Sequence, residues 1–248
     1  RLGLDRNLDL GPSGLRRQAV GHILQEVAGA HDLLAKLEDS KAITIYQGDR
    51  YASLSDHLAL LTRRAIDIWQ GFLVNFHDDR RLANVHLALA MLYSLKQSAP
   101  EAIAEYKLVA NGFSSSPLAP YALLGSSRLK NSLRDYAGAC QDLRELVEQY
   151  AGTEIANRAY VYLADSTAKA GQKAEAARLY RMVYNVTSSA ESQKAAAFGA
   201  GTCYYDAANY ELAAKWLSRF IDLAEEAGDR HLGSAYFLLG KTFMALQQ

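Results

Sequence analysis

The chain has little proline and little cysteine. Its 248 residues contain only four prolines and two cysteines. Because proline interrupts the interior of a helix, its scarcity favours a helical fold. Two cysteines are too few for a disulfide scaffold. We expect Cys140 and Cys203 to be small core residues that do not pair with each other.

An excess of charge and a long apolar run are also missing. Lys plus Arg and Asp plus Glu number 27 each, so the net charge is zero. Nucleic-acid binders usually carry an excess of basic residues, which this chain lacks, so we expect no nucleic-acid partner. No apolar run approaches the roughly 18 residues of a membrane span, so we expect no transmembrane segment. The chain begins with Arg1 and shows no signal-peptide pattern, so we expect a processed or truncated chain.

Recognisable catalytic and metal-binding patterns are absent as well. None of the six histidines lies four residues from another, and His22 with Glu26 makes only two of the ligands that a metal needs. The chain has neither a nucleophile elbow nor a phosphate-binding loop. Its best pair of acids is Asp165 with Asp206. The sequence therefore predicts a protein that is not an enzyme and holds no metal and no cofactor.

What the chain does contain is apolar residues at helical spacing, interrupted at regular intervals. A helical segment of uncertain type is predicted from Leu15 to about Leu37 within residues 1–54, followed by an irregular loop. Ser55 is predicted to open a long helix. Short breaks then separate helices of about 12–18 residues. The breaks are predicted at 97–100, 114–120, 131–136, 151–153, 171–173, 187–191, 207–209 and 226–229.

A two-helix pattern recurs every 35–39 residues, which predicts a stack of helical hairpins. The clearest copy comprises Phe198, Gly201, Tyr204, Tyr205, Asn209, Tyr210 and Ala213. A second copy comprises Tyr160, Leu163, Ala164, Gly171, Ala176 and Tyr180. A third comprises Tyr121, Leu124, Gly125, Tyr136 and Ala139, with about two extra residues in its turn, and the last begins Tyr236, Leu239, Gly240 and Phe243.

These residues resemble the tetratricopeptide repeat family. The resemblance covers residues 55–248 as about five units, of which the last is incomplete. It implies an all-α fold, an α-α superhelix of antiparallel helix pairs.

Two joints between units carry a second resemblance. The stretches NGFSSSPLAPYALLG and EQYAGTEIANRAYVYLA are similar to joints of bacterial extracytoplasmic repeat proteins, which include outer-membrane assembly proteins and envelope coordinators. This resemblance implies a location in the bacterial periplasm or at the envelope. A cytoplasmic scaffold is the alternative.

In the repeat family, the first helix of each unit forms the inner wall of a binding groove. Carried over, this predicts a peptide-binding groove made of Arg158, Tyr162, Asp165, Lys169, Phe198, Thr202, Tyr205, Phe237 and Lys241. In the unit before them, Ala122, Ser126, Leu129 and Lys130 are predicted to face outward. Aromatics can bury apolar anchors of a peptide while cations meet its carboxylates. In the alternative interpretation, Phe198 and Phe237 simply pack against the next helix.

The favoured function is a non-catalytic scaffold that binds a peptide or a domain of a partner protein in an envelope or secretion complex. A second hypothesis is a structural segment of a longer repeat protein. It rests on the last helix, where Leu238, Leu239, Phe243 and Leu246 are predicted to be exposed. That surface could serve a homo-oligomer. A membrane-associated complex is a separate expectation for the partner. A third hypothesis is a helical-toroid ligand-binding protein or enzyme.

Overall fold

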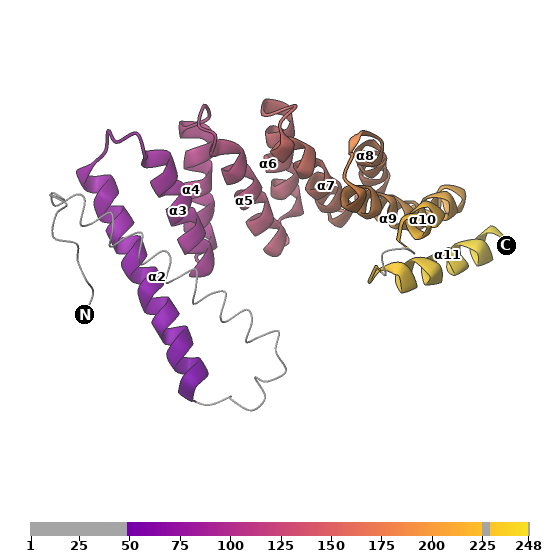
Figure 1. The fold of residues 1–248 in the computed structure, drawn as a ribbon, viewed down its shortest axis with the longest axis horizontal. Helices are drawn as coiled ribbons and strands as arrows, with labels where there is room; N and C mark the ends of the chain where they lie inside the picture. Colours follow the sequence, from indigo (N-terminus) through magenta and orange to yellow (C-terminus); the bar gives the residue numbers. More distant parts are fainter. Residues whose placement is uncertain (1–48, 225–228, 248) are drawn as a thin grey trace. The chain divides into compact units, whose positions relative to one another are not determined.

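The computed structural model describes residues 49–224 and 229–247, and every regular element in them is an α-helix (Figure 1). The all-α prediction is therefore confirmed for this part of the chain, while the helix predicted at Leu15–Leu37 lies outside it. The helices are α2 (Asp49–Asn75), α3 (Leu82–Leu95), α4 (Ala99–Gly112), α5 (Ala119–Ser132), α6 (Tyr136–Gln149), α7 (Glu154–Lys169), α8 (Lys173–Val186), α9 (Ala190–Asp206), α10 (Tyr210–Ala224) and α11 (Leu232–Leu246).

The predicted breaks from 97–100 to 207–209 agree with the observed helix ends, while most of the break predicted at 226–229 lies outside the described residues. The predicted start of the first long helix differs. The long helix α2 begins at Asp49, six residues before the predicted start at Ser55. No proline or glycine stands between the two positions, so nothing in the sequence stops the helix from continuing backward. The predicted loop over residues 40–53 is therefore wrong for residues 49–53.

The chain forms two compact units, and the first extends to Glu105. In its described part, α2 packs against α3. The amide of Gln70 on α2 donates to the hydroxyl of Tyr93 on α3 at 2.8 Å. His86 Nδ1 of α3 lies 2.6 Å from Glu105 Oε2 of α4. Leu89 and Ala90 of α3 are fully buried.

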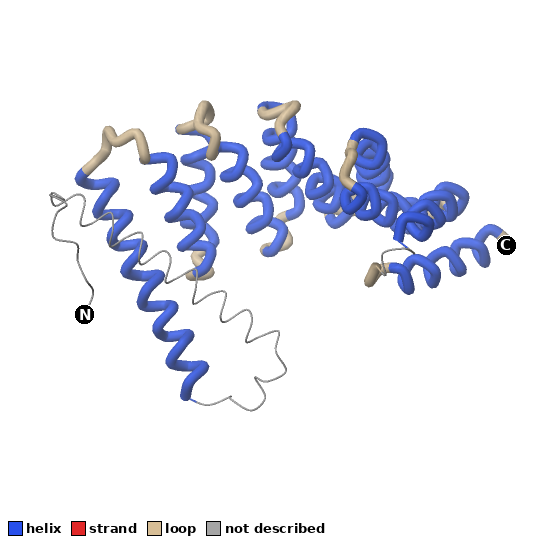
Figure 2. The backbone as a smooth tube through the Cα atoms, viewed as in Figure 1, coloured by secondary structure: helices blue, strands red, loops and turns tan. Residues whose placement is uncertain are grey.

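The second unit begins at Tyr106 and contains α5 to α11. Each helix from α5 to α11 packs against the next one in the chain. The odd-numbered helices α5, α7, α9 and α11 also contact one another in succession. Figure 2 shows the helices in blue and the described turns between them in tan. These four helices therefore form one continuous layer, which is the arrangement expected of the inner wall of a helical-repeat stack.

The repeat has a constant step through most of the chain. Ala102, Ala139, Ala176 and Ala213 follow one another at intervals of 37 residues, and all four are fully buried. Each stands near the start of the second helix of a hairpin, where only a small side chain lets the two helices approach closely. The matching positions on the first helices are Ala90, Ser127, Ala164 and Gly201, which are buried too.

This step corrects the predicted register of α5. The sequence pattern equated Gly125 with Ala164, but the structure equates Ser127 with Ala164. The turn between α5 and α6 has the same length as the turn between α7 and α8, so it holds no extra residues. Ala122, Ser126 and Lys130, predicted to face outward, are all buried. They belong to the face of α5 that packs against its neighbours.

A buried ion pair joins α5 to α6 at this face. Lys130 Nζ lies 2.6 Å from Asp142 Oδ2, and both side chains are more than nine-tenths buried. Ser126 Oγ donates to the same carboxylate at 2.6 Å. The ammonium also reaches the backbone oxygen of Gly138 at 3.4 Å. The interface between these two helices is thus partly polar, and its polar groups satisfy one another.

The turns inside the hairpins repeat a backbone feature as well. Gln97, Arg134, Gly171 and Ala208 have positive φ values of 62°, 62°, 86° and 56°. They too are 37 residues apart, and each ends a first helix in the left-handed conformation. Only Gly171 is a glycine, so three of the four turns hold a side chain where glycine is favoured.

Candidate functional site

The predicted site residues lie on the layer of odd-numbered helices in the second unit, on α7, α9 and α11. On α7 they share one face. Arg158, Tyr162 and Lys169 are exposed, and Asp165 is half-buried. Lys169 Nζ lies 2.7 Å from Asp165 Oδ2 one turn away. This face therefore presents an aromatic ring beside an arginine, while the carboxylate already has a cation.

The structure brings three further predicted residues together across α9 and α11. Lys241 Nζ of α11 lies 5.5 Å from the ring centroid of Tyr205 on α9 and 5.7 Å from that of Phe237. Tyr205 also contacts Tyr210 edge to face at 5.7 Å. Phe237 is 70% exposed. We call Tyr205, Phe237 and Lys241 the aromatic–lysine cluster; it presents a cation between two rings, a favourable arrangement.

Phe198 lies in a more enclosed place. Its ring is half-buried, with centroids 5.0 Å from Phe220 and 5.1 Å from His231. The packing interpretation thus describes Phe198 well, although its ring still lines a cavity of about 600 Å³. Thr202, one turn further along α9, lines the same cavity and donates its hydroxyl to the backbone oxygen of Gly199 at 2.9 Å.

We call this cavity the inner groove. Its other lining residues come from α7, α8, α9, α10 and the segment that leads into α11. They are Asp165, Tyr180, Glu191, Lys194, Ala195, Gly199, Phe220, Asp229, Arg230 and His231. Tyr180 closes the bottom, where burial raises the pKa of its phenol far above the ordinary value. A Cβ on Gly199 would stand 2.5 Å from this ring, so the floor needs glycine there.

The acids around the groove are neutralised by lysines. Lys194 Nζ lies 2.8 Å from Glu191 and 3.4 Å from Asp229. A hydrogen bond from the backbone of His231 and the nearby ammonium hold the pKa of Asp229 below its usual value. In turn, Glu191 raises the pKa of Lys194. Further along, Lys173 Nζ lies 2.9 Å from Asp206 Oδ2.

Two cations, one on α11 and one in the segment that leads into it, have no carboxylate partner within the described residues. They are Lys241, which touches only aromatic rings, and Arg230, whose Nε approaches His231. The described acids nearby are already paired, so among the described residues the surplus charge there is positive. Charge complementarity therefore favours an acidic ligand beside these two cations.

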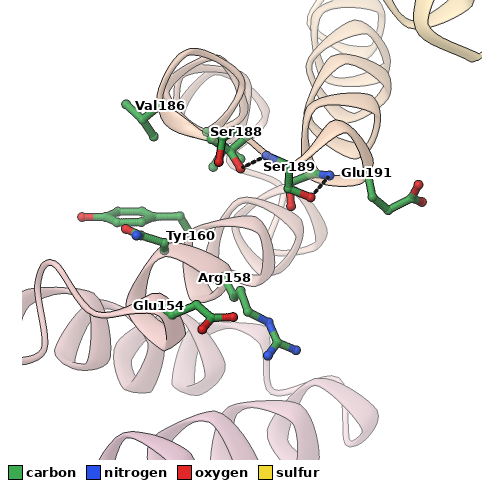
Figure 3. Close-up of a pocket in the computed structure, with 11 residues that line it drawn as sticks. Glu154, Arg158, Tyr160, Val186, Ser188, Ser189 and Glu191 are labelled. Atoms are coloured by element: carbon green, nitrogen blue, oxygen red, sulfur yellow. Dashed lines mark hydrogen bonds between the residues drawn. The ribbon is translucent and has the colours of Figure 1, made fainter.

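Sequence reasoning missed a second cleft, between the first turns of α7 and the α8–α9 turn (Figure 3). Its volume is about 470 Å³. Glu154 and Arg158 line one side, and Ser188 and Ser189 line the other (Figure 3). Ser189 caps α9 by accepting the backbone N–H of Ser192 at 3.3 Å. The run of small polar residues after Val186 predicted the turn, but a cleft depends on packing that no local pattern shows.

The arrangement offers little for catalysis. Asp165 and Asp206, the best pair of acids in the sequence, each have a lysine of their own. Burial raises the pKa of the Cys203 thiol to about 11, which disfavours the reactive thiolate. Both cysteines are buried and free, as predicted. Among residues 49–224 and 229–247, no three His, Cys, Asp or Glu side chains gather as metal ligands do.

None of the helices in the described part of the chain is both long and apolar enough to cross a bilayer. No family model matches the sequence. No curated protein matches it either.

Solved structures do match the fold. The apo form of RapI superposes with a TM-score of 0.66 at 11% identity, covering 94% of this chain and 72% of RapI. Kinesin light chain TPR-like repeats from Podosopora anserina give 0.59 at 15% identity over 82% of this chain and 96% of theirs. BtubC from P. vanneervenii gives 0.56 at 15% identity, with coverages of 87% and 93%. At such low identity these likenesses show the fold alone: the described part of the chain is a tetratricopeptide-like helical solenoid.

Proposed function

We propose that the chain is a non-catalytic protein-interaction scaffold that binds an acidic segment of a partner protein along α9 and α11. The observation that carries the proposal is the aromatic–lysine cluster, where Lys241 stands between Tyr205 and Phe237. Exposed rings can bury an apolar side chain of the partner, and the cation can pair with a carboxylate beside it. The inner groove begins near this cluster, because its lining residue Thr202 lies one turn before Tyr205 on α9.

The solenoid supports this function because it holds scattered anchors rigidly. The helices of the layer are fixed by their neighbours, so little ordering entropy is lost when a segment binds. The carboxylates of the groove are already paired, which leaves the cations of α11 and its leading segment to select the charge of the ligand.

The test compares four baits in a pull-down from the native organism, followed by direct titration of the captured partner. Tyr205→Ala and Lys241→Glu should each lower the affinity for the partner, by roughly tenfold or more for the charge reversal. Lys215→Glu is the matched control, since this exposed lysine lies on α10, outside the inner layer. Circular dichroism checks that all baits are folded. A partner that binds all four equally would overturn the groove assignment.

The dependence of the binding affinity on salt tests whether the partner is recognised by its charge. Binding that depends on Lys241 should weaken as ionic strength rises from about 0.05 to 0.5 M, because exposed charges are screened. The Lys241→Met variant should bind more weakly but lose most of this dependence. If the wild type binds equally well across the range, the ligand is not recognised by its charge.

We also propose that the scaffold works at the bacterial envelope, in an assembly or secretion complex. Support comes from the joints around Ser116 and Thr153, which resemble those of extracytoplasmic repeat proteins. Fractionation of the native organism tests this: recovery with periplasmic or envelope material is expected. Recovery with the cytoplasm alone would favour the cytoplasmic alternative.

A further inference from the structure

The second helices of successive hairpins face one another across a repeated pair of positions. Between α4 and α6, both positions line one cavity of about 190 Å³. The 37-residue step repeats the pair between α6 and α8 and again between α8 and α10. In chain order the pair consists of Lys107 and Glu145, then Arg144 and Met182, then Arg181 and Arg219. Of these three pairs, only the last brings two like charges to one site.

Aromatic rings fill the corresponding space between α8 and α10. The cavity between α4 and α6 is lined by Ala110, Lys130 and Asp142, and two steps of the repeat later these positions hold Tyr184, Tyr204 and Trp216. The rings of Tyr184 and Trp216 meet edge to face, with their centroids 5.1 Å apart. The guanidinium carbon of Arg219 lies 4.8 Å from the ring centroid of Trp216 and 5.6 Å from that of Tyr184. Arg181 Nη1 donates to the Tyr204 hydroxyl at 3.2 Å. We call these five side chains the outer arginine site.

Both guanidiniums of this site lack a carboxylate partner within the described part of the chain. Arg181 is exposed and Arg219 is half-buried, and no described acid forms an ion pair with either of them. Asp222, three residues after Arg219 on α10, is exposed and does not pair with it. A guanidinium that stacks on a ring keeps the N–H groups at its edge free to donate. The site therefore holds two oriented cations that can accept an anion.

Two arginines at one site favour an anion with two negative charges on one group. A carboxylate carries a single charge. A phosphomonoester carries about −1.5 to −2 at pH 7 and presents three strong acceptor oxygens. Arginine matches such a group because its N–H fork can bind two of the oxygens at once. The pair on α8 and α10 therefore fits a phosphate group better than it fits one carboxylate.

The charges on either side of the site restrict what can carry the phosphate. Glu211 and Asp222 stand before and after Arg219 along α10, and both are exposed. A nucleic-acid backbone or an anionic membrane extends over many negative charges and would meet repulsion from these acids. A single phosphorylated side chain would reach the two arginines without covering the acids. The surrounding charge thus favours a phosphorylated protein.

We propose that the outer arginine site binds a phosphorylated side chain of a partner protein. Arg219, held by the two rings, and Arg181, held by the Tyr204 hydroxyl, both donate to the phosphate oxygens. The site lies on the even-numbered helices and includes no residue of the aromatic–lysine cluster. Its occupation therefore does not depend on binding at α9 and α11.

A capped phosphoserine, N-acetyl-O-phosphoserine amide, is the probe for this site. It has no charge other than its phosphate. Titration into the whole chain is followed by the fluorescence of Trp216, which Arg219 contacts, in a Trp69→Phe background that removes the second tryptophan. We expect a saturable change with a Kd of about 1 mM or lower. N-acetylglutamate amide should bind at least tenfold more weakly because it carries one charge.

Protein variants in the same background locate the binding. Arg219→Met and Arg181→Met should each lower the affinity roughly tenfold or more. Methionine keeps an unbranched side chain that can still pack on the rings, and circular dichroism checks the folding. Arg144→Met is the matched control, since Arg144 holds the position of Arg181 one step earlier but faces Met182. It should leave the affinity unchanged, and so should Lys241→Glu, which tests the other surface.

Four results would overturn the proposal. One is the absence of any saturable change up to about 10 mM phosphoserine probe. Another is equal affinity of wild type and Arg219→Met by phosphorus NMR. The third is a glutamate probe that binds as tightly as the phosphoserine probe. The fourth is tighter binding, lost in Arg219→Met, of an oligonucleotide or of vesicles that contain phosphatidic acid, because the phosphate would then belong to a polyanion.

Discussion

The hairpins α5–α6 and α9–α10 share the same backbone turn, with a positive φ at Arg134 and Ala208, but have different interiors. In α5–α6 the facing residues are Lys130 and Asp142, which form a buried ion pair. Seventy-four residues later the same two positions hold Tyr204 and Trp216, which are buried as well. The hairpin backbone therefore accepts either a satisfied polar pair or two aromatics. What it requires is the small residue beside them, Ser127 in one hairpin and Gly201 in the other.

The largest effect should come from breaking the ion pair of α5–α6. Replacing Lys130 by Met leaves the Asp142 carboxylate buried without its cation, and we expect the free energy of unfolding to fall by about 3–5 kcal/mol. Urea denaturation measures this. The control is Lys169→Met, which breaks the exposed pair with Asp165 and should cost less than about 1 kcal/mol. Equal losses in the two variants would contradict the role of burial.

Replacing the polar set with residues of α7–α8 should restore this stability. The triple variant Ser126→Leu, Lys130→Thr and Asp142→Leu copies Leu163, Thr167 and Leu179, which occupy the same positions 37 residues later. No polar group then lacks a partner, so stability should return to within about 1–2 kcal/mol of wild type in the same urea titration. A triple variant as unstable as Lys130→Met would show that the hairpin interiors are not interchangeable.

Two glycines test the contrast between the covered helix and the open one. An alanine at Gly201 would crowd Leu217, and we expect a loss of about 1–3 kcal/mol. The same change at Gly240 meets open space and should stabilise the chain by up to about 1 kcal/mol through helix propensity. Thermal unfolding of both variants gives the comparison. A loss at Gly240 as large as that at Gly201 would mean that a side chain already covers α11.

The smallest effects are expected in the turns. Ala208 has a φ of 56°, so Ala208→Gly should raise stability by about 0.5–1 kcal/mol. At Gly171, with a φ of 86°, the reverse change to alanine should lower it by about 1 kcal/mol. Both values follow from urea denaturation. The two variants should change the stability in opposite directions. A change in the same direction would contradict a shared left-handed conformation at these two turns.

Most of the fold could be predicted from the sequence because helix breaks are local. Gly171 and the short polar runs between helices indicate where each helix ends. The register of α5 could not be predicted. Tyr121 and Gly125 imitate the family pattern, while the residues that fill the interface, Ser126 and Lys130, look like surface residues. Lys130 is buried only because Asp142, on another helix, receives it.

The candidate site was predictable to a smaller degree. A constant repeat places Tyr205 and Lys241 on consecutive inner helices, so their proximity follows from the pattern. The packing of Phe198 against Phe220 and His231 involves a loop whose path the repeat does not specify. The cleft beside Arg158 depends on how the α8–α9 turn lies over α7, which is likewise a property of the folded chain.

The constant 37-residue step also has a mechanical consequence. From α5 to α11 each helix is held by its neighbours in the chain, so under a pulling force a terminal hairpin can detach while the hairpins behind it stay packed. Pulled in an optical trap, this part of the molecule should lengthen in steps. Each released hairpin contributes about 120–130 Å of extended chain. The extension of the molecule would then report how many hairpins have unfolded.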